Sequence, residues 1–153
     1  MSFEPVPLNL PPYPFRLTEK DGNTYIFDEI RKKHLFLTPE EWVRQHFIQF
    51  LASAHAFPKT LIRIEGGLQL HQMQKRSDLL VYDRQGNKVV LVECKAPGVR
   101  IDQKVFDQAA RYNLVHKARW LAVTNGLNHY YARIDHDAGL FQFFEKLPVY
   151  EEL

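Results

Sequence analysis

The spacing of apolar residues changes along the chain, and each change predicts a different element. From Thr38 to about Pro58, apolar residues recur every three or four positions, which predicts an amphipathic helix. Thr38 suits the N-cap of this helix, Pro39 suits its first position, and Glu41 completes a capping box. The residues expected to face the core are Val43, Phe47, Phe50, Leu51 and Ala54.

Three strands are predicted next, at Leu61–Ile64, Asp78–Asp83 and Lys88–Glu93. Residues 84–87 would form the turn between the last two, and Gly66-Gly67 predicts a bend or bulge after the first. Both faces of this hairpin are apolar, with Leu80, Tyr82, Val89 and Leu91 on one face and Leu79, Val81, Val90 and Val92 on the other. Because strands buried on both faces need a covering layer on each, an α/β sandwich is expected.

A second helix is predicted from about Asp102 to Lys117, with Asp102 as its cap, followed by a short strand at Trp120–Thr124. The order is therefore helix, three strands, helix, strand. This order indicates an α/β fold in which helices flank a mixed central sheet.

The two ends of the chain are expected to decorate this core within a single domain of residues 1–153. Residues 1–37 would form an extended, proline-rich arm and a hairpin at Tyr13–Phe27 with its turn at residues 21–23, followed by an exposed link at residues 31–33. The core would occupy residues 38–125. Residues 126–153 would add a C-terminal hairpin made of His129–Arg133 and Leu140–Phe144.

The register of the central hairpin brings two acidic residues together. If the turn is centred between Gln85 and Gly86, Asp78 lies directly opposite Glu93 on the same face. Two like charges opposite each other destabilise a sheet, and apolar neighbours raise the cost. Lys95 lies two residues beyond Glu93 and projects to the same face.

A divalent cation would resolve this charge conflict. Carboxylate oxygens suit Mg²⁺, for which Mn²⁺ can substitute, and such a metal polarises a phosphodiester and acidifies a bound water. Asp78 and Glu93 are the candidate ligands, the backbone carbonyl of Cys94 is a further one, and Lys95 would assist the attacking water. The alternative is an ordinary ion pair of Lys95 with one of the acids.

The second helix contributes another candidate. Gln108 interrupts an apolar stripe that includes Val105, Tyr112 and Val115, so a buried amide with partners in the site is expected. A core glutamine or a slightly rotated stripe is the alternative, and Tyr112 is as consistent with the core as with a site. Glu40 extends the core-facing stripe of the first helix and is a possible third metal ligand, with Glu41 as the alternative. Both acids would equally serve the helix dipole.

Charge and composition narrow the function classes. The segment 59–119 carries 12 Lys and Arg against 6 Asp and Glu, so a polyanion would be attracted there. The chain lacks an apolar run long enough for a transmembrane helix and a signal-peptide pattern, and its single cysteine suits the cytoplasm. The candidate phosphate contacts are Lys75, Arg76, Arg100, Lys104 and Arg111.

These motifs resemble those of a known superfamily. Arg76-Ser77-Asp78, then Glu93-Cys94-Lys95, then Gln108 with Tyr112 are similar to the PD-(D/E)xK nucleases, and in particular to the N-terminal nuclease region of type I restriction motor subunits and small stand-alone relatives. The run Pro39–Gln45 is similar to their opening helix. Ser77 replaces the proline of the eponymous motif.

The resemblance implies a restriction-endonuclease-like core, αβββαβ, with Mg²⁺-dependent cleavage of DNA. Asp78 and Glu93 match the metal ligands, Lys95 the catalytic lysine, Gln108 and Tyr112 the second-helix motif, and Glu40 the acid of the first helix. DNA, restriction or repair subunits and a second copy of the chain are the expected partners. A nucleic-acid-binding module that does not cleave, or a subunit of a larger complex, is the alternative function.

Overall fold

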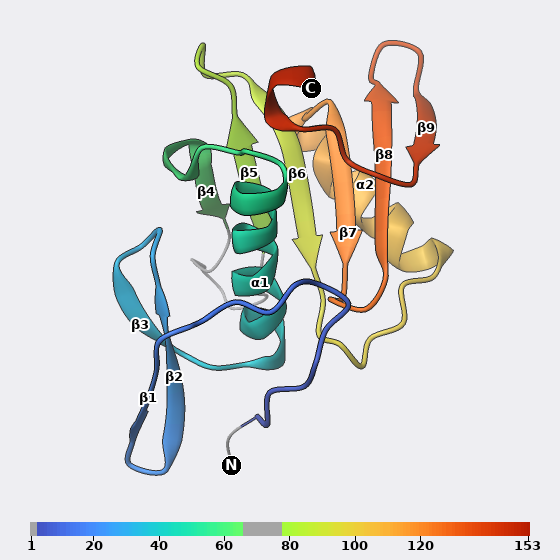
Figure 1. Cartoon of the computed structure of the whole chain (residues 1–153). Helices are drawn as coiled ribbons and strands as arrows, with labels where there is room; N and C mark the ends of the chain where they lie inside the picture. The colour runs from blue at the N-terminus through green and yellow to red at the C-terminus, as the bar shows by residue number, and fades with distance from the viewer. Residues whose placement is uncertain (1–2, 66–77) are drawn as a thin grey trace.

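A six-stranded mixed sheet with one helix on each face forms the centre of the molecule (Figure 1). The structure is a computed structural model and describes residues 3–65 and 78–153. The strands lie in the order β4 (Ile62–Glu65), β5 (Asp78–Tyr82), β6 (Lys88–Cys94), β7 (Trp120–Thr124), β8 (His129–Asp135) and β9 (Leu140–Phe144). Strands β6 and β7 are parallel, and the other neighbouring pairs are antiparallel. The predicted α/β class and the predicted order of core elements are confirmed.

Both helices begin at the caps that the sequence predicts. In α1 (Pro39–Ala54), the Thr38 hydroxyl oxygen accepts a hydrogen bond from the Glu41 amide at 3.0 Å. In α2 (Gln103–His116), the Asp102 carboxylate accepts one from the Val105 amide, also at 3.0 Å. These bonds satisfy amides that the first helical turn leaves without intrahelical partners. Within the described residues, no helix has the length and apolar character needed to span a membrane.

Two hydrophobic clusters lie between the layers of the fold, one between α1 and the sheet and one between α2 and the sheet. On the α1 side, Phe47 and Leu51 pack against Leu79, Val81, Val90 and Val92 of the hairpin, among others. On the α2 side, Phe106 and Ala109 pack against Leu80, Leu91, Leu121 and Val123. Except at Val89, the alternation of the hairpin side chains between two buried faces is therefore as predicted. At the end of α1, however, Phe50 is only half-buried and Ala54 is exposed.

One hairpin residue lies on the other side from the predicted one. Between Val81 and Tyr82 the register shifts, so Val81 pairs with Val90 but Tyr82 pairs with Lys88. Val89 consequently packs in the α1-side cluster instead of beside Leu80. A bulge of this kind places one additional residue on one strand and reverses the face of its side chain.

The N-terminal segment forms a second, three-stranded sheet made of β1 (Leu17–Lys20), β2 (Asn23–Asp28) and β3 (Lys33–Phe36). The predicted turn at residues 21–23 is present, with Asp21 and Gly22 both at positive φ. The predicted exposed link at 31–33 is wrong at Lys33, which begins β3. Short 3-10 turns at Lys59–Leu61 and Tyr150–Glu152 complete the elements, and the expected bend at Gly66-Gly67 lies outside the described residues.

Three histidines, of which His46 is buried and His55 and His129 are half-buried, predict how stability depends on pH. Burial is the main cause that lowers the pKa of His46, His55 and His129, and backbone hydrogen bonds oppose it. Unfolded histidine has a pKa of about 6.5, so below this pH the unfolded chain binds protons that the folded chain does not. The free energy of unfolding should therefore fall as the pH drops through about 6.5 towards the lowered folded pKa values.

Urea unfolding at about pH 7.5 and 5.5 would measure this change, because the two pH values bracket the unfolded histidine pKa. A variant with all three histidines replaced by glutamine should lose less stability over the same interval. An equal loss in both proteins would contradict the assignment.

Candidate metal and nucleic-acid site

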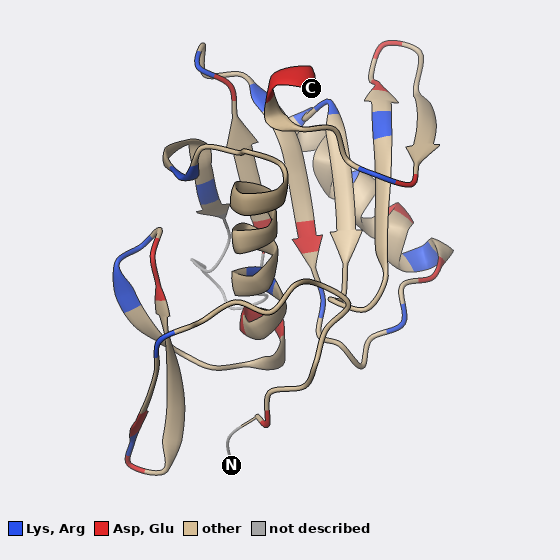
Figure 2. Cartoon of the chain, viewed as in Figure 1, with Lys and Arg blue, Asp and Glu red and all other residues tan. Residues whose placement is uncertain are grey.

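Two buried carboxylates face each other at one end of the sheet. Asp78 begins β5 and pairs with Glu93 near the end of β6, as the hairpin register predicts. The two residues are 0% and 4% exposed, and they share the face that carries Leu80 and Leu91. The acidic end of β6 is visible at the base of the sheet (Figure 2). Such a pair carries a high desolvation cost, which a cation would offset.

Lys95 lies next to this pair. Its ammonium Nζ is 3.3 Å from Glu93 Oε2, and its side chain is 28% exposed. The backbone amide of Lys95 donates to the carbonyl of Thr124 at 2.8 Å, which extends the parallel pairing of β6 with β7 by one residue. The lysine is therefore held at its backbone while its side chain reaches both the acid and solvent.

Cys94 faces the opposite side of the sheet, as expected, and packs in the α1-side cluster. Burial is the main cause that raises the pKa of its thiol. Among the nearby charges, Arg44 lowers this pKa, whereas Asp78, Glu93 and Glu41 raise it. A thiol of this kind is inert. Charged residues of α1 therefore lie near the same strand end as the acid pair.

The buried acid of α1 is Glu41, and the expectation that Glu40 faces the core is wrong. Glu41 is 6% exposed, whereas Glu40 is partly exposed. The Glu41 carboxylate accepts a hydrogen bond from Gln45 Nε2 at 2.7 Å and lies 3.2 Å from Arg44 Nη1. Arg31 Nη2 is 3.7 Å away. These cations supply the partners that a buried carboxylate requires.

Sequence reasoning missed Arg44 and Gln45, which are 7% and 2% exposed. The available signal was their spacing, since they follow Glu41 by three and four residues and so lie on its side of the helix. The prediction gave Glu41 a capping role and an alternative role as metal ligand, and it did not use this spacing.

The prediction that Gln108 is buried is also wrong. Gln108 is exposed, and Phe106, Ala109 and Asn113 are the buried residues of α2. The apolar stripe is rotated relative to the predicted one, so the expected stripe member Val115 is 76% exposed. Tyr112 is half-buried and packs against the α2-side cluster, and its ring centroid lies 4.9 Å from that of His116.

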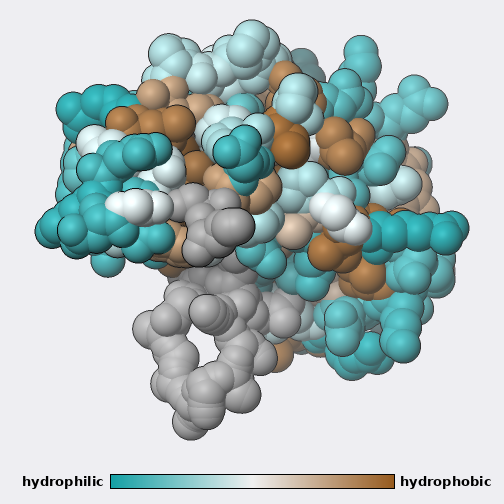
Figure 3. Space-filling view, turned by 90° about the horizontal axis from the view of Figure 1, so that it is seen from below, coloured by the Kyte–Doolittle hydropathy of each residue, from teal (hydrophilic) through white to brown (hydrophobic). Residues whose placement is uncertain are grey.

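The expected phosphate contacts divide into two groups. Arg100, Lys104 and Arg111 are exposed, which leaves them accessible to a polyanion. Lys75 and Arg76 lie outside the described residues. Viewed from the end where β6 and β7 finish, the surface is mainly hydrophilic with scattered apolar side chains (Figure 3).

The residues present fit a hard cation with few protein ligands. Within residues 3–65 and 78–153, no group of three or more His, Cys, Asp and Glu side chains is placed to bind a metal. Mg²⁺ commonly needs only one or two carboxylates, because it keeps several waters. The facing pair Asp78 and Glu93 provides this oxygen donor set, whereas Glu41 is already bonded to Gln45.

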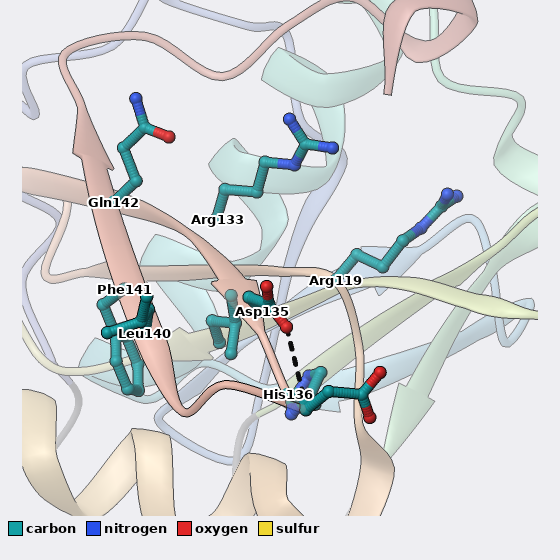
Figure 4. Close-up of a pocket in the computed structure, with 9 residues that line it drawn as sticks. Arg119, Arg133, Asp135, His136, Leu140, Phe141 and Gln142 are labelled. Carbon is teal, nitrogen blue, oxygen red and sulfur yellow. Dashed lines mark hydrogen bonds between the residues drawn. The ribbon is translucent and has the colours of Figure 1, made fainter.

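A pocket of about 650 Å³ lies away from these residues (Figure 4). Arg119, Arg133 and Gln142 are among its lining residues. Arg119 precedes β7, whereas Thr124 at the other end of β7 bonds to Lys95, so the pocket and the acid pair lie at opposite ends of the sheet. The size of this pocket does not outweigh the chemistry of the acid pair, because none of the predicted site residues lines it.

The fold and the site define a mixed α/β domain with a buried acid pair and an adjoining lysine at one sheet end. The chain belongs to the family described as type I restriction enzyme R protein N terminus (HSDR_N), whose model matches residues 39–148. The matched segment runs from α1 past β9 and includes all of the acid pair, Lys95 and α2.

Similarity to solved structures and to curated proteins is more limited than the family match. The chain is similar to a fragment assigned to the HsdR subunit of a type I restriction enzyme from Vibrio vulnificus, with 22% sequence identity and a TM-score of 0.39. The similarity covers 60% of this chain and 17% of that chain. No curated protein matches the chain.

Proposed function

We propose that the chain is a metal-dependent nuclease domain of the PD-(D/E)xK type with a restriction-endonuclease-like core, and that it hydrolyses phosphodiester bonds in DNA. The observation that carries the proposal is the direct pairing of Asp78 with Glu93, both buried, beside Lys95. Membership in a restriction-enzyme family supports the same chemistry.

In this proposal Asp78 and Glu93 hold Mg²⁺, for which Mn²⁺ can substitute, with the Cys94 carbonyl as a further oxygen donor. The bound cation supplies Lewis-acid activation of the phosphodiester and of water. Lys95 releases Glu93, orients the attacking water and stabilises the negative charge that develops on the phosphate. Glu41 is a better candidate than Glu40 for a supporting role beside the direct metal ligands, since Glu41 is buried near the strand end that carries Asp78 and Glu93.

The exposed side chains of α2 would contact the nucleic acid. Gln108, Lys104 and Arg111 are exposed on this helix, and Arg100 precedes it. Because Gln108 is exposed, its side-chain amide would donate to a phosphate oxygen instead of bonding to the buried site residues. Tyr112 would position the helix. Other restriction subunits are the proposed partners, and the cytoplasm is the proposed location.

Metal binding gives a direct test of the acid pair. Calorimetric titration should show Mg²⁺ or Mn²⁺ binding to the wild-type protein, and Asp78→Asn should abolish it because the facing carboxylates are the proposed ligands. Asp107→Asn removes an exposed carboxylate of α2 and serves as the control. Equal binding by wild type and Asp78→Asn would refute the ligand assignment.

A further inference from the structure

The N-terminal arm, residues 3–14, crosses the molecule to the end of the sheet that carries Lys95. Figure 1 shows this blue segment passing the N-terminal end of α1 and reaching the turn after β7. Leu8 and Leu10 of the arm pack against the α1-side cluster. The Val6 carbonyl accepts a hydrogen bond from Trp42 Nε1 at 2.8 Å, which ties the arm to α1.

The arm is also bonded to the turn that follows β7. The Asn9 amide donates to the Gly126 carbonyl at 2.8 Å, and the Asn9 carbonyl lies 3.0 Å from His129 Nε2. Gly126 has φ +86°, and a Cβ added there would lie 2.8 Å from a Leu8 methyl group. A side chain at this position would be strained at this φ and would have to displace the Leu8 methyl group.

His129 joins the arm to Thr124. The imidazole Nδ1 of His129 lies 2.7 Å from the Thr124 hydroxyl oxygen. Burial lowers the pKa of His129, so its ring is neutral near pH 7. The Asn9 carbonyl can only accept, so Nε2 carries the proton and Nδ1 accepts the Thr124 hydroxyl proton.

Thr124 in turn holds Lys95. The Thr124 hydroxyl oxygen accepts from the Gly126 amide at 2.9 Å, and the Thr124 carbonyl accepts from the Lys95 amide at 2.8 Å. Asn125 adds a second link, since its side-chain amide donates to the Val99 carbonyl in the loop after Lys95 at 2.8 Å. Hydrogen bonds therefore connect the arm through His129 and Thr124 to the backbone of Lys95.

We propose that His129 is a positioning residue for Lys95, and that the N-terminal arm is the strap that holds His129 in place through Asn9. This proposal rests on the proposed function, because it assigns a purpose to the placement of Lys95. The arm buttresses the carboxyl end of β7 and fixes the backbone from which the lysine projects. A lysine that acts on a phosphodiester needs such fixation, since an error of about 1 Å can cost a factor of about 100 in rate.

Two substitutions separate the hydrogen bonds from the bulk of the ring. His129→Phe keeps an aromatic ring but removes both bonds, whereas His129→Gln can still accept from Thr124 and donate to Asn9. His136→Phe is the matched control, because His136 bonds to the Ala118 carbonyl at 2.8 Å and lies just beyond the opposite end of β8.

Amide hydrogen exchange at Lys95 is the first readout and needs no catalysis. His129→Phe should raise the exchange rate of the Lys95 amide about tenfold or more, while His129→Gln and His136→Phe leave it near the wild-type value. Unchanged exchange in His129→Phe would overturn the proposal, whether or not the wild-type protein cleaves DNA.

Cleavage kinetics are the second readout. In His129→Phe, kcat should fall about tenfold with little change in KM, and His129→Gln should restore most of it. A cleaving protein whose kcat is unaffected by His129→Phe would also overturn the proposal. If the wild type does not cleave but the exchange result holds, the strap is supported and the nuclease function alone fails.

Discussion

Replacing Lys95 by alanine is expected to lower the rate of Mg²⁺-dependent DNA cleavage by at least about 100-fold, the effect of removing one preorganised charge-stabilising donor. Lys95 Nζ is 3.3 Å from Glu93 Oε2 and its side chain is partly exposed, so it reaches both the proposed metal ligand and solvent. A plasmid nicking assay would measure the rate. The substitution should leave the fold intact, because the backbone bond of Lys95 to Thr124 does not involve its side chain.

Lys20→Ala is the matched control for this substitution. Lys20 is an exposed lysine of β1, in the separate three-stranded sheet, and its loss changes the net charge equally. It should cleave at nearly the wild-type rate. Undiminished cleavage by the Lys95 variant would show that the lysine has no part in the reaction.

Phe47→Ala is expected to have the largest effect on stability. Phe47 is 0% exposed and sits in the α1-side cluster, where its ring contacts Phe50 and His129. Truncating a buried phenylalanine typically costs about 3–5 kcal/mol, through lost transfer free energy and the cavity that remains. Urea unfolding monitored by circular dichroism would measure the change in the free energy of unfolding.

Phe143→Ala gives the comparison for a surface phenylalanine. Phe143 lies in β9 and is 59% exposed, with one aromatic contact to Phe106. Its truncation should cost about 1 kcal/mol, the range of an aromatic pair. Equal losses in the two variants would contradict the placement of the core between α1 and the sheet.

The central hairpin was predictable because its signals are local. Apolar residues on both faces, turn residues at 84–87 and acids at the strand ends together predict the pairing of Asp78 with Glu93. The bulge after Val81 was not predictable, since one additional residue changes the pairing near the turn without changing the apolar pattern. The pairs from residue 78 to 81 keep the predicted register, so the acid pair is unaffected.

The orientation of the helices depended on tertiary contacts that the sequence pattern does not contain. Asn113 is 0% exposed because its side chain exchanges two hydrogen bonds with the backbone of Ala118. This burial rotates α2 and leaves Gln108 in solvent. Glu41 is similarly buried because Arg44 and Gln45 supply partners, and a carboxylate without them would have faced water.

The contacts of the N-terminal arm also could not be predicted from the sequence. Its prolines predict an extended segment, but the contacts of Asn9 with Gly126 and His129 join residues that are more than 100 positions apart. Such bonds depend on the finished sheet. The sequence therefore predicts the pairing of Asp78 with Glu93 better than it predicts the contacts that surround this pair.

Incubation of the purified wild-type protein with plasmid DNA, with Mg²⁺ and in parallel with excess EDTA, tests the central claim most directly. Asp78 and Glu93 are proposed to bind the metal on which hydrolysis depends. Nicked or linear DNA should appear with Mg²⁺ and disappear with EDTA. No product under either condition, or equal product with EDTA, would contradict a metal-dependent nuclease at this acid pair.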